Sequence, residues 1–93
     1  MFYSVNEPID ALVVYCSGAP HPLLRAFRWK NRRYDVTSTH LIHQEREGET
    51  VYLVYSVDCN GATYILRLDT KRGRWTLEAL DVSAEESVVG CDA

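Results

Sequence analysis

Two runs of alternating apolar residues meet at the dipeptide Asn60-Gly61, and this feature constrains the fold more than any other. The run before the dipeptide is VYLVYSVDC and the run after it is ATYILRL. Alternation with a period of two is typical of a half-buried β-strand. Asn-Gly is the strongest short hairpin signal, because a type I′ turn needs positive φ at both central positions. The sequence therefore predicts an antiparallel hairpin over residues 51–68.

A two-residue turn at Asn60-Gly61 also fixes the register of this hairpin. On the apolar face the predicted pairs are Cys59 with Ala62, Val57 with Tyr64, Tyr55 with Leu66, and Leu53 with Leu68. The opposite face pairs Val54 with Arg67 and Tyr52 with Asp69. We expect that second face to be exposed to solvent or covered by only a thin second layer of the chain.

A third strand is expected after Lys71-Arg72-Gly73, which supplies the next turn. The predicted partners are Asp69 with Arg74, Leu68 with Trp75, Leu66 with Leu77, and Tyr64 with Ala79. A three-residue loop with a glycine bulge would shift this register by one.

The segment RAFRWKNRRYDV, residues 25–36, predicts another hairpin with Lys30 and Asn31 as its turn. Phe27 then faces Tyr34, and Trp29 faces Arg32. By alternation the inward side chains are Phe27, Tyr34 and Val36, and the outward ones are Arg28, Arg33 and Asp35.

The remaining segments give weaker signals. Residues 9–16 predict a strand, and residues 18–22, which contain two prolines, predict a rigid loop. Residues 40–43 fit either a continued strand or a single helical turn, and residues 45–49 predict an exposed connection around Gly48. Residues 83–86 match a capping box, which favours a short helix that Gly90 would end.

Together these segments predict a single all-β domain over residues 1–82, followed by an acidic tail over residues 83–93 that forms a short helix or a frayed end. We expect a strongly bent antiparallel meander of five or six strands that closes toward a small SH3-like barrel, because no long helix is available to cover the sheet. The predicted core consists of Val51, Leu53, Tyr55, Tyr64, Leu66, Leu68, Trp75 and Leu77.

Basic residues gather on the two predicted turns, although the formal net charge of the chain is −3. The candidate binding residues are Arg25, Arg28, Trp29, Lys30, Arg32 and Arg33 on the first hairpin, and Lys71, Arg72 and Arg74 on the second turn. Arginine and lysine neutralise phosphates and tryptophan stacks on bases, a combination that small β-barrels use on single strands. The alternative is structural, since alternation forces charge outward on any half-buried hairpin, and Arg32 could then lie on Trp29 as a cation–π pair.

The histidines and cysteines do not suggest a catalytic or metal site. His40 and His43 point to opposite faces if they lie on a strand, and no third ligand follows at a recognisable spacing. The three cysteines form no CxxC pair and are odd in number, which predicts reduced thiols. Cys59 precedes a tight turn and could be exposed, yet its neighbours Asp58 and Asn60 indicate no lowered pKa. We expect no enzyme activity, no cofactor and no metal.

The order of several motifs resembles a small uncharacterised bacterial family, domain of unknown function family 6504. The matching residues are Glu7-Pro8-Ile9, Phe27-Arg28-Trp29, Arg33-Tyr34-Asp35-Val36, Gly61, Tyr64, Leu66, Gly73-Arg74-Trp75 and Leu77-Glu78. Where the family usually has a turn glycine this chain has Asn31, and no tryptophan lies between Thr37 and Thr50. The resemblance implies association with translesion DNA polymerases and an accessory role in DNA damage tolerance, and it supplies no catalytic residues.

The sequence thus favours a small adaptor module whose partner is another protein. Weak, sequence-independent binding of single-stranded nucleic acid through the first hairpin is the alternative. No apolar run approaches the roughly 18 residues of a membrane-spanning helix, and the N-terminus lacks a basic region followed by an apolar core. We therefore expect a cytoplasmic protein without a membrane partner. The acidic tail could also fold onto the basic hairpins and mask them.

Overall fold

The computed structural model describes residues 2–81, which form seven β-strands and the turns between them. The strands are β1 (Phe2–Val14), β2 (Leu23–Trp29), β3 (Arg32–Asp35), β4 (Ser38–Glu47), β5 (Thr50–Cys59), β6 (Ala62–Asp69) and β7 (Arg74–Asp81). The all-β prediction is confirmed, and no helix that could span a membrane occurs in this part of the chain. The predicted capping box and the whole acidic tail, residues 83–93, lie outside the described residues.

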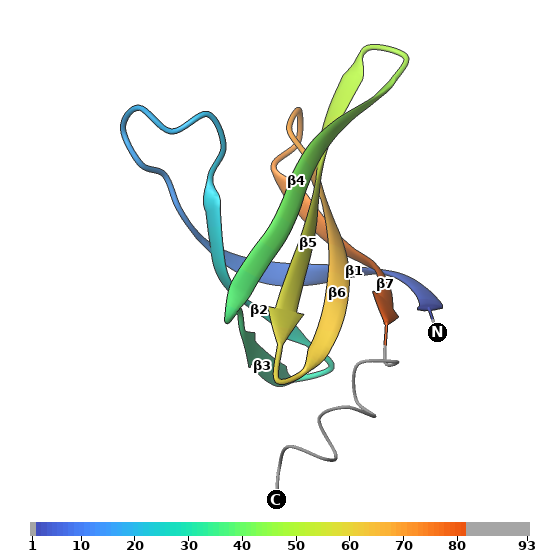
Figure 1. Cartoon of the computed structure of the whole chain (residues 1–93). Helices are drawn as coiled ribbons and strands as arrows, with labels where there is room; N and C mark the ends of the chain where they lie inside the picture. The colour runs from blue at the N-terminus through green and yellow to red at the C-terminus, as the bar shows by residue number, and fades with distance from the viewer. Residues whose placement is uncertain (1, 82–93) are drawn as a thin grey trace, which may run out of the picture.

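The strands form one antiparallel sheet in the order β3-β2-β1-β7-β6-β5-β4, which curls into a small barrel-like fold (Figure 1). β1 turns the corner between the two halves, because Phe2–Ile9 pairs with β7 whereas Asp10–Val14 pairs with β2. At the opposite corner the Val36 N–H donates to the Arg25 carbonyl at 2.9 Å. The neighbouring Thr37 N–H donates to the Asp58 carbonyl at 2.8 Å. The bend between the outer strands β3 and β4 is thereby bonded to both β2 and β5.

The two predicted two-residue turns are confirmed together with their registers. Every pair expected across Asn60-Gly61 is present between β5 and β6. In the first hairpin Phe27 faces Tyr34 and Trp29 faces Arg32. Lys30 and Asn31 have φ values of 54° and 61°, and Asn60 and Gly61 have values of 53° and 86°. These are the left-handed conformations that a type I′ turn requires.

The third strand, β7, follows the prediction only as far as Leu77. Asp69 faces Arg74, Leu68 faces Trp75 and Leu66 faces Leu77, but a bulge then shifts the register. Tyr64 consequently faces Leu80, and the predicted pairing with Ala79 is wrong. The extra residue is Glu78, whose carboxylate lies 3.0 Å from the Arg67 guanidinium, so the bulge accommodates an ion pair on the outer face.

The strand count is seven because Ser38–Glu47 forms β4. This strand includes residues 40–43, for which the sequence left two alternatives. Glu45, Arg46 and Glu47 pair with Tyr52, Val51 and Thr50. The predicted exposed connection over residues 45–49 is therefore wrong except at Gly48 and Glu49, which form the turn. Charged side chains on β4 fit its position at the edge of the sheet, where charge discourages pairing with other chains.

Seven of the eight predicted core residues are buried, from Leu53 to Leu77 along the chain. Val51 is only half-buried, since the pairing of β5 with β6 begins one residue later, at Tyr52. The core also includes Leu24, Phe27 and Val57, none of which is more than 2% exposed. Phe27 stacks on Tyr34 with ring centroids 5.1 Å apart.

Cys59 is another core residue, because it is 0% exposed although it lies beside a turn. Burial raises the pKa of its thiol to about 12, and the nearby charges of Asp58 and Asp35 act in the same direction. The thiol is therefore neutral at physiological pH. Val54, on the opposite face of the sheet, is also buried and is only 3% exposed.

Candidate binding face

The described residues contain no group of three or more histidine, cysteine or acidic side chains that could hold a metal ion. Each of the two histidines on β4 instead pairs with one acid. His40 Nε2 lies 2.8 Å from Asp58 Oδ2, and His43 Nε2 lies 3.0 Å from Glu45 Oε2. Both histidines are exposed, so these contacts are ordinary surface pairs.

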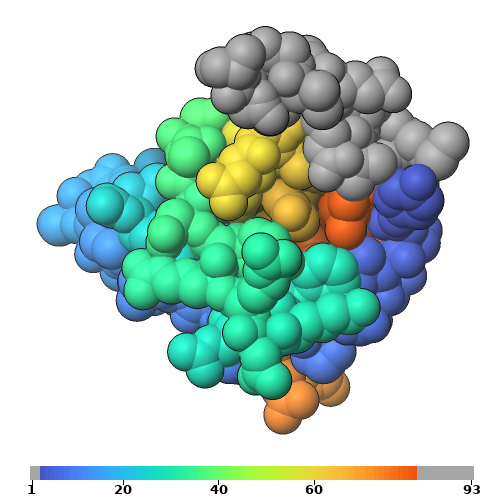
Figure 2. All heavy atoms as spheres, turned by 90° about the horizontal axis from the view of Figure 1, so that it is seen from below, coloured from blue at the N-terminus to red at the C-terminus, as the bar shows by residue number. Residues whose placement is uncertain are grey.

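The basic residues of the first hairpin differ in how they are engaged. Arg33 Nε donates to Asp35 Oδ1 at 2.8 Å. Arg25, Arg28 and Arg32 are exposed and form no ion pair with another residue in the range 2–81. Figure 2 looks onto this end of the molecule and shows the β2–β3 hairpin, in teal, spread across it. The hairpin is therefore a surface with unneutralised positive charge.

Trp29 is held in place rather than free to stack on a ligand. Its indole Nε1 donates to Glu7 Oε1 at 2.9 Å, which ties the end of β2 to β1. Its ring centroid lies 6.1 Å from that of Tyr34, and the Lys30 ammonium lies 5.0 Å from the Trp29 centroid. The cation over the ring is thus Lys30, not the Arg32 that the sequence suggested.

Of the three candidate cations around the second turn, Arg72 is the one that forms an ion pair within residues 2–81. Arg72 Nη1 lies 3.3 Å from Asp69 Oδ2. Partial burial alone would raise the pKa of Asp69, but its carboxylate accepts the backbone N–H groups of Arg72 and Lys71, and the net result is a lowered pKa. Lys71 and Arg74 form no ion pair with another described residue.

Arg67 is the centre of an ion-pair network on the outer face of β4–β7. Its Nη2 lies 2.8 Å from Glu45 Oε1 and 3.0 Å from Glu78 Oε2, and its guanidinium carbon lies 4.8 Å from the centroid of the Tyr52 ring. The hydrogen bond from His43 has the largest effect on the pKa of Glu45 and lowers it, burial opposes this, and the charges of Arg67 and His43 lower the pKa further. This network belongs to the structure of the sheet and leaves little free charge.

The tips of the two basic turns lie at opposite ends of the barrel, at the bottom and top of Figure 1. The strand ends that flank these two turns nevertheless approach each other across β1. Ile9 faces Trp75 while the next residue, Asp10, faces Arg28, and Arg28 in turn faces Arg33. Asp10 lines one groove with Arg28 and Arg33 and another with Arg74. Arg28, Arg33 and Arg74 therefore share the surface around Asp10, while Lys71 and Arg72 do not.

Beside these arginines lies an apolar strip that the sequence analysis missed. Leu12, Val14 and Leu23 are 53%, 41% and 41% exposed. Val14 faces Leu23, and Leu12 is two residues from Val14 on the same face of β1. The signal was present in the run Ala11-Leu12-Val13-Val14, which is apolar on both faces of a strand, while residues 15–81 form no helix that could cover the second face.

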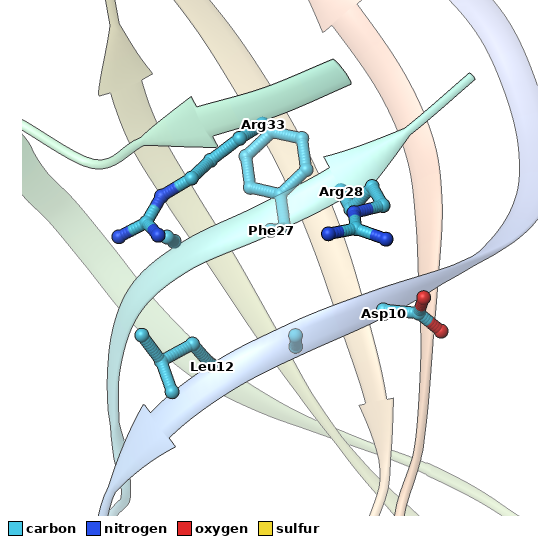
Figure 3. A pocket seen from close by; sticks show the side chains of 7 residues that line it. Asp10, Leu12, Phe27, Arg28 and Arg33 are labelled. Atoms are coloured by element: carbon cyan, nitrogen blue, oxygen red, sulfur yellow. The ribbon is translucent and has the colours of Figure 1, made fainter. Parts of the chain in front are cut away.

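The strip and the arginines together form what we call the β1–β2 face: Asp10, Leu12 and Val14 of β1, Leu23, Ala26 and Arg28 of β2, and Arg33 of β3. An open hollow of about 360 Å³ lies on it, lined by Asp10, Leu12, Ala26, Arg28 and Arg33 together with Ala11 and Phe27 (Figure 3). Its surroundings combine aliphatic and cationic groups.

Comparison of the chain with models of protein families, with curated proteins and with solved structures finds no match. The resemblance to domain of unknown function family 6504 therefore stays a prediction, and the candidate site rests on geometry and chemistry.

Proposed function

We propose that this chain is a small, non-enzymatic β-barrel module that binds a protein partner. The observation that carries the proposal is the exposed aliphatic strip of Leu12, Val14 and Leu23 beside Arg28 and Arg33. Scattered single apolar residues on a surface are normal, whereas a contiguous patch rimmed by polar groups is typical of an interaction site. Interfaces also favour arginine over lysine, as this face does.

The cellular setting that we propose is the one that the family resemblance implies. The module would be an accessory protein in DNA damage tolerance, and its partner would belong to an assembly with a translesion DNA polymerase. The proposal adds no catalytic role for this chain, and it places the protein in the cytoplasm with its partner.

Isolation of native complexes through an affinity tag on the full chain tests this function. We expect a defined partner to co-purify with the wild-type protein and with Leu41→Asp, because Leu41 is 55% exposed on β4, away from the β1–β2 face. Leu12→Asp should lose the partner. Recovery of the wild-type chain alone, with neither a partner nor self-association, would contradict the proposal.

A second candidate function is weak binding of single-stranded nucleic acid by the β2–β3 hairpin. It is favoured by the exposed guanidinium groups of Arg25, Arg28 and Arg32, which form no ion pair with the rest of residues 2–81. It is weakened by the engagement of Trp29 with Glu7 and Lys30, which leaves the ring less available for stacking.

Fluorescence anisotropy with a labelled oligodeoxythymidine tests this candidate. Binding should fall steeply between low and physiological salt and should be abolished by charge reversal of Arg28 and Arg33, because phosphate contacts release counterions. A protein that does not bind the oligonucleotide even at low salt would exclude this function.

A further inference from the structure

We propose that the β1–β2 face accepts an acidic peptide segment that carries an aliphatic anchor residue. This inference rests on the proposed function as a protein-binding module and names the chemistry of the partner. It depends on three properties of the face, namely its exposed apolar strip, its exposed arginines and the aliphatic rather than aromatic character of that strip.

The apolar strip supplies the place for the anchor. Leu12 forms one side of the hollow, and the small side chain of Ala26 lies opposite it in the register of β1 and β2 (Figure 3). Val14 and Leu23 extend the aliphatic surface away from the hollow. A Leu, Ile or Val side chain of a partner would cover exposed carbon on all three residues, and removal of apolar surface from water drives such association.

The arginines supply the place for carboxylates. Figure 3 shows Arg28 and Arg33 projecting from β2 and β3 beside the hollow, with Leu12 and Asp10 on β1. Arg28 has no ion-pair partner among residues 2–81. Arg33 contacts Asp35 through Nε, so its terminal nitrogens remain as donors. Arginine binds carboxylates in a bidentate geometry, and two carboxylates near the anchor would engage both guanidinium groups.

The same properties argue against the other occupants of this face. A nucleic acid needs stacking surfaces, but the exposed apolar residues of this face are the aliphatic Leu12, Val14 and Leu23. The nearby Trp29 ring already has the Lys30 ammonium 5.0 Å from its centroid. A second copy of the chain would bring like charges together, because an isologous contact places the same patch on both sides. An acidic segment complements both the charge and the aliphatic surface.

Selection from a phage-displayed library of random peptides of about 12 residues on the immobilised full chain provides the test. We expect the enriched sequences to combine Asp or Glu with Leu, Ile or Val. A synthetic peptide of the dominant sequence should bind at least roughly tenfold more weakly to Leu12→Asp and to the Arg28→Glu/Arg33→Glu variant. Binding to Leu41→Asp should stay within about twofold of wild type, and affinity should fall as salt is added.

A Leu12→Ser variant serves as a second probe of the anchor site, because it removes the aliphatic surface without adding charge. Enriched peptides that lack acidic residues, or that bind the Leu12 and arginine variants as well as wild type, would overturn the inference and leave the module function standing. Absence of any enrichment over blank beads would overturn both. Oligodeoxythymidine binding that depends on Arg28, without peptide binding, would assign the face to nucleic acid instead.

Discussion

Cys16 and Cys59 have opposite environments, and the difference follows from their positions in the fold. Cys16 lies in the exposed loop after β1, whereas Cys59 ends β5 with its side chain in the core. Only the thiolate is an effective nucleophile. A buried thiol with a pKa of about 12 is therefore inert in the folded protein.

Thiol titration with a chromogenic disulfide reagent checks this difference. The measurement uses the Cys91→Ser variant, which removes the third cysteine of the chain. One thiol should react quickly at neutral pH in the folded state, and the second only after denaturant is added. Adding Cys16→Ser should abolish the fast reaction. A fast reaction that persists in this double variant would mean that Cys59 is accessible.

Burial of a particular side chain was harder to predict than the direction in which it points. Alternation placed Tyr55, Leu66 and Leu77 in the core, and each is 0% exposed. It could not show that Cys59 is covered, since covering depends on which other segments lie above a residue.

The turn of the first hairpin is an element whose conformation the sequence determines only in part. Lys30 and Asn31 both have positive φ, although residues other than glycine, asparagine and aspartate avoid this region. Asn tolerates it better than other side chains, and glycine tolerates it best.

The direction in which a substitution of Asn31 changes the free energy of unfolding is therefore predictable. Asn31→Gly should raise the free energy of unfolding by roughly 0.5 kcal/mol, and Asn31→Val should lower it by about 1–2 kcal/mol because a β-branched residue is strained at positive φ. Urea denaturation of both variants measures these changes. Equal stability of the Gly and Val variants would show that the turn does not adopt the left-handed conformation.

The elements that the sequence predicted best are those set by local turns. Asn60-Gly61 and Lys30-Asn31 determine two hairpins through residues adjacent in the chain, and both registers are confirmed. The elements that it predicted poorly contain bulges. Asn6, with φ of 53°, interrupts the pairing of β1, and extra residues at His40 and Glu78 interrupt β4 and β7. A bulge breaks the alternation on which strand prediction depends.

At the scale of the whole molecule, the buried ionisable groups make the stability of the fold depend on pH in the alkaline range. Burial raises the pKa of Tyr55 to about 12, and the charge of Tyr15 adds to the effect. Tyr55 also donates its hydroxyl proton to the Pro22 carbonyl at 2.6 Å, which ties the loop after β1 to the core. Cys59 behaves in the same way, with a pKa of about 12. Both groups hold their protons more tightly in the folded state.

The ordinary pKa of the thiol is 9.0. Below that pH both groups are protonated whether the chain is folded or unfolded, so the free energy of unfolding should not change. It should fall as the pH rises from 9.0 toward 12. The expected loss by about pH 10.5 is roughly 2–3 kcal/mol. Cys59→Ala should remove most of this dependence, whereas Cys16→Ser should leave it intact. Urea denaturation at a series of pH values measures it, and an equally steep loss in Cys59→Ala would contradict the assignment.

The candidate site was predictable only as a set of cations. Arg28, Arg33 and Arg74 could be named from the sequence, but they share one surface because β1 lies between β2 and β7. That arrangement joins segments far apart in the chain, and no local pattern encodes it. The aliphatic strip beside them was not predicted, because residues 9–16 indicated only a strand. The exposure of Leu12 and Val14 depends on which other segments pack against that strand.

The most direct test of the binding face is site-specific photo-crosslinking in the cells that produce the protein. A photoreactive phenylalanine analogue replaces Leu12 in one version and Leu41 in another, since the two leucines are 53% and 55% exposed on different parts of the sheet. We predict a discrete crosslinked product from position 12, with an acidic partner peptide attached, and none from position 41. Crosslinking at position 41 but not at position 12, or the same products from both, would contradict the assignment of the β1–β2 face.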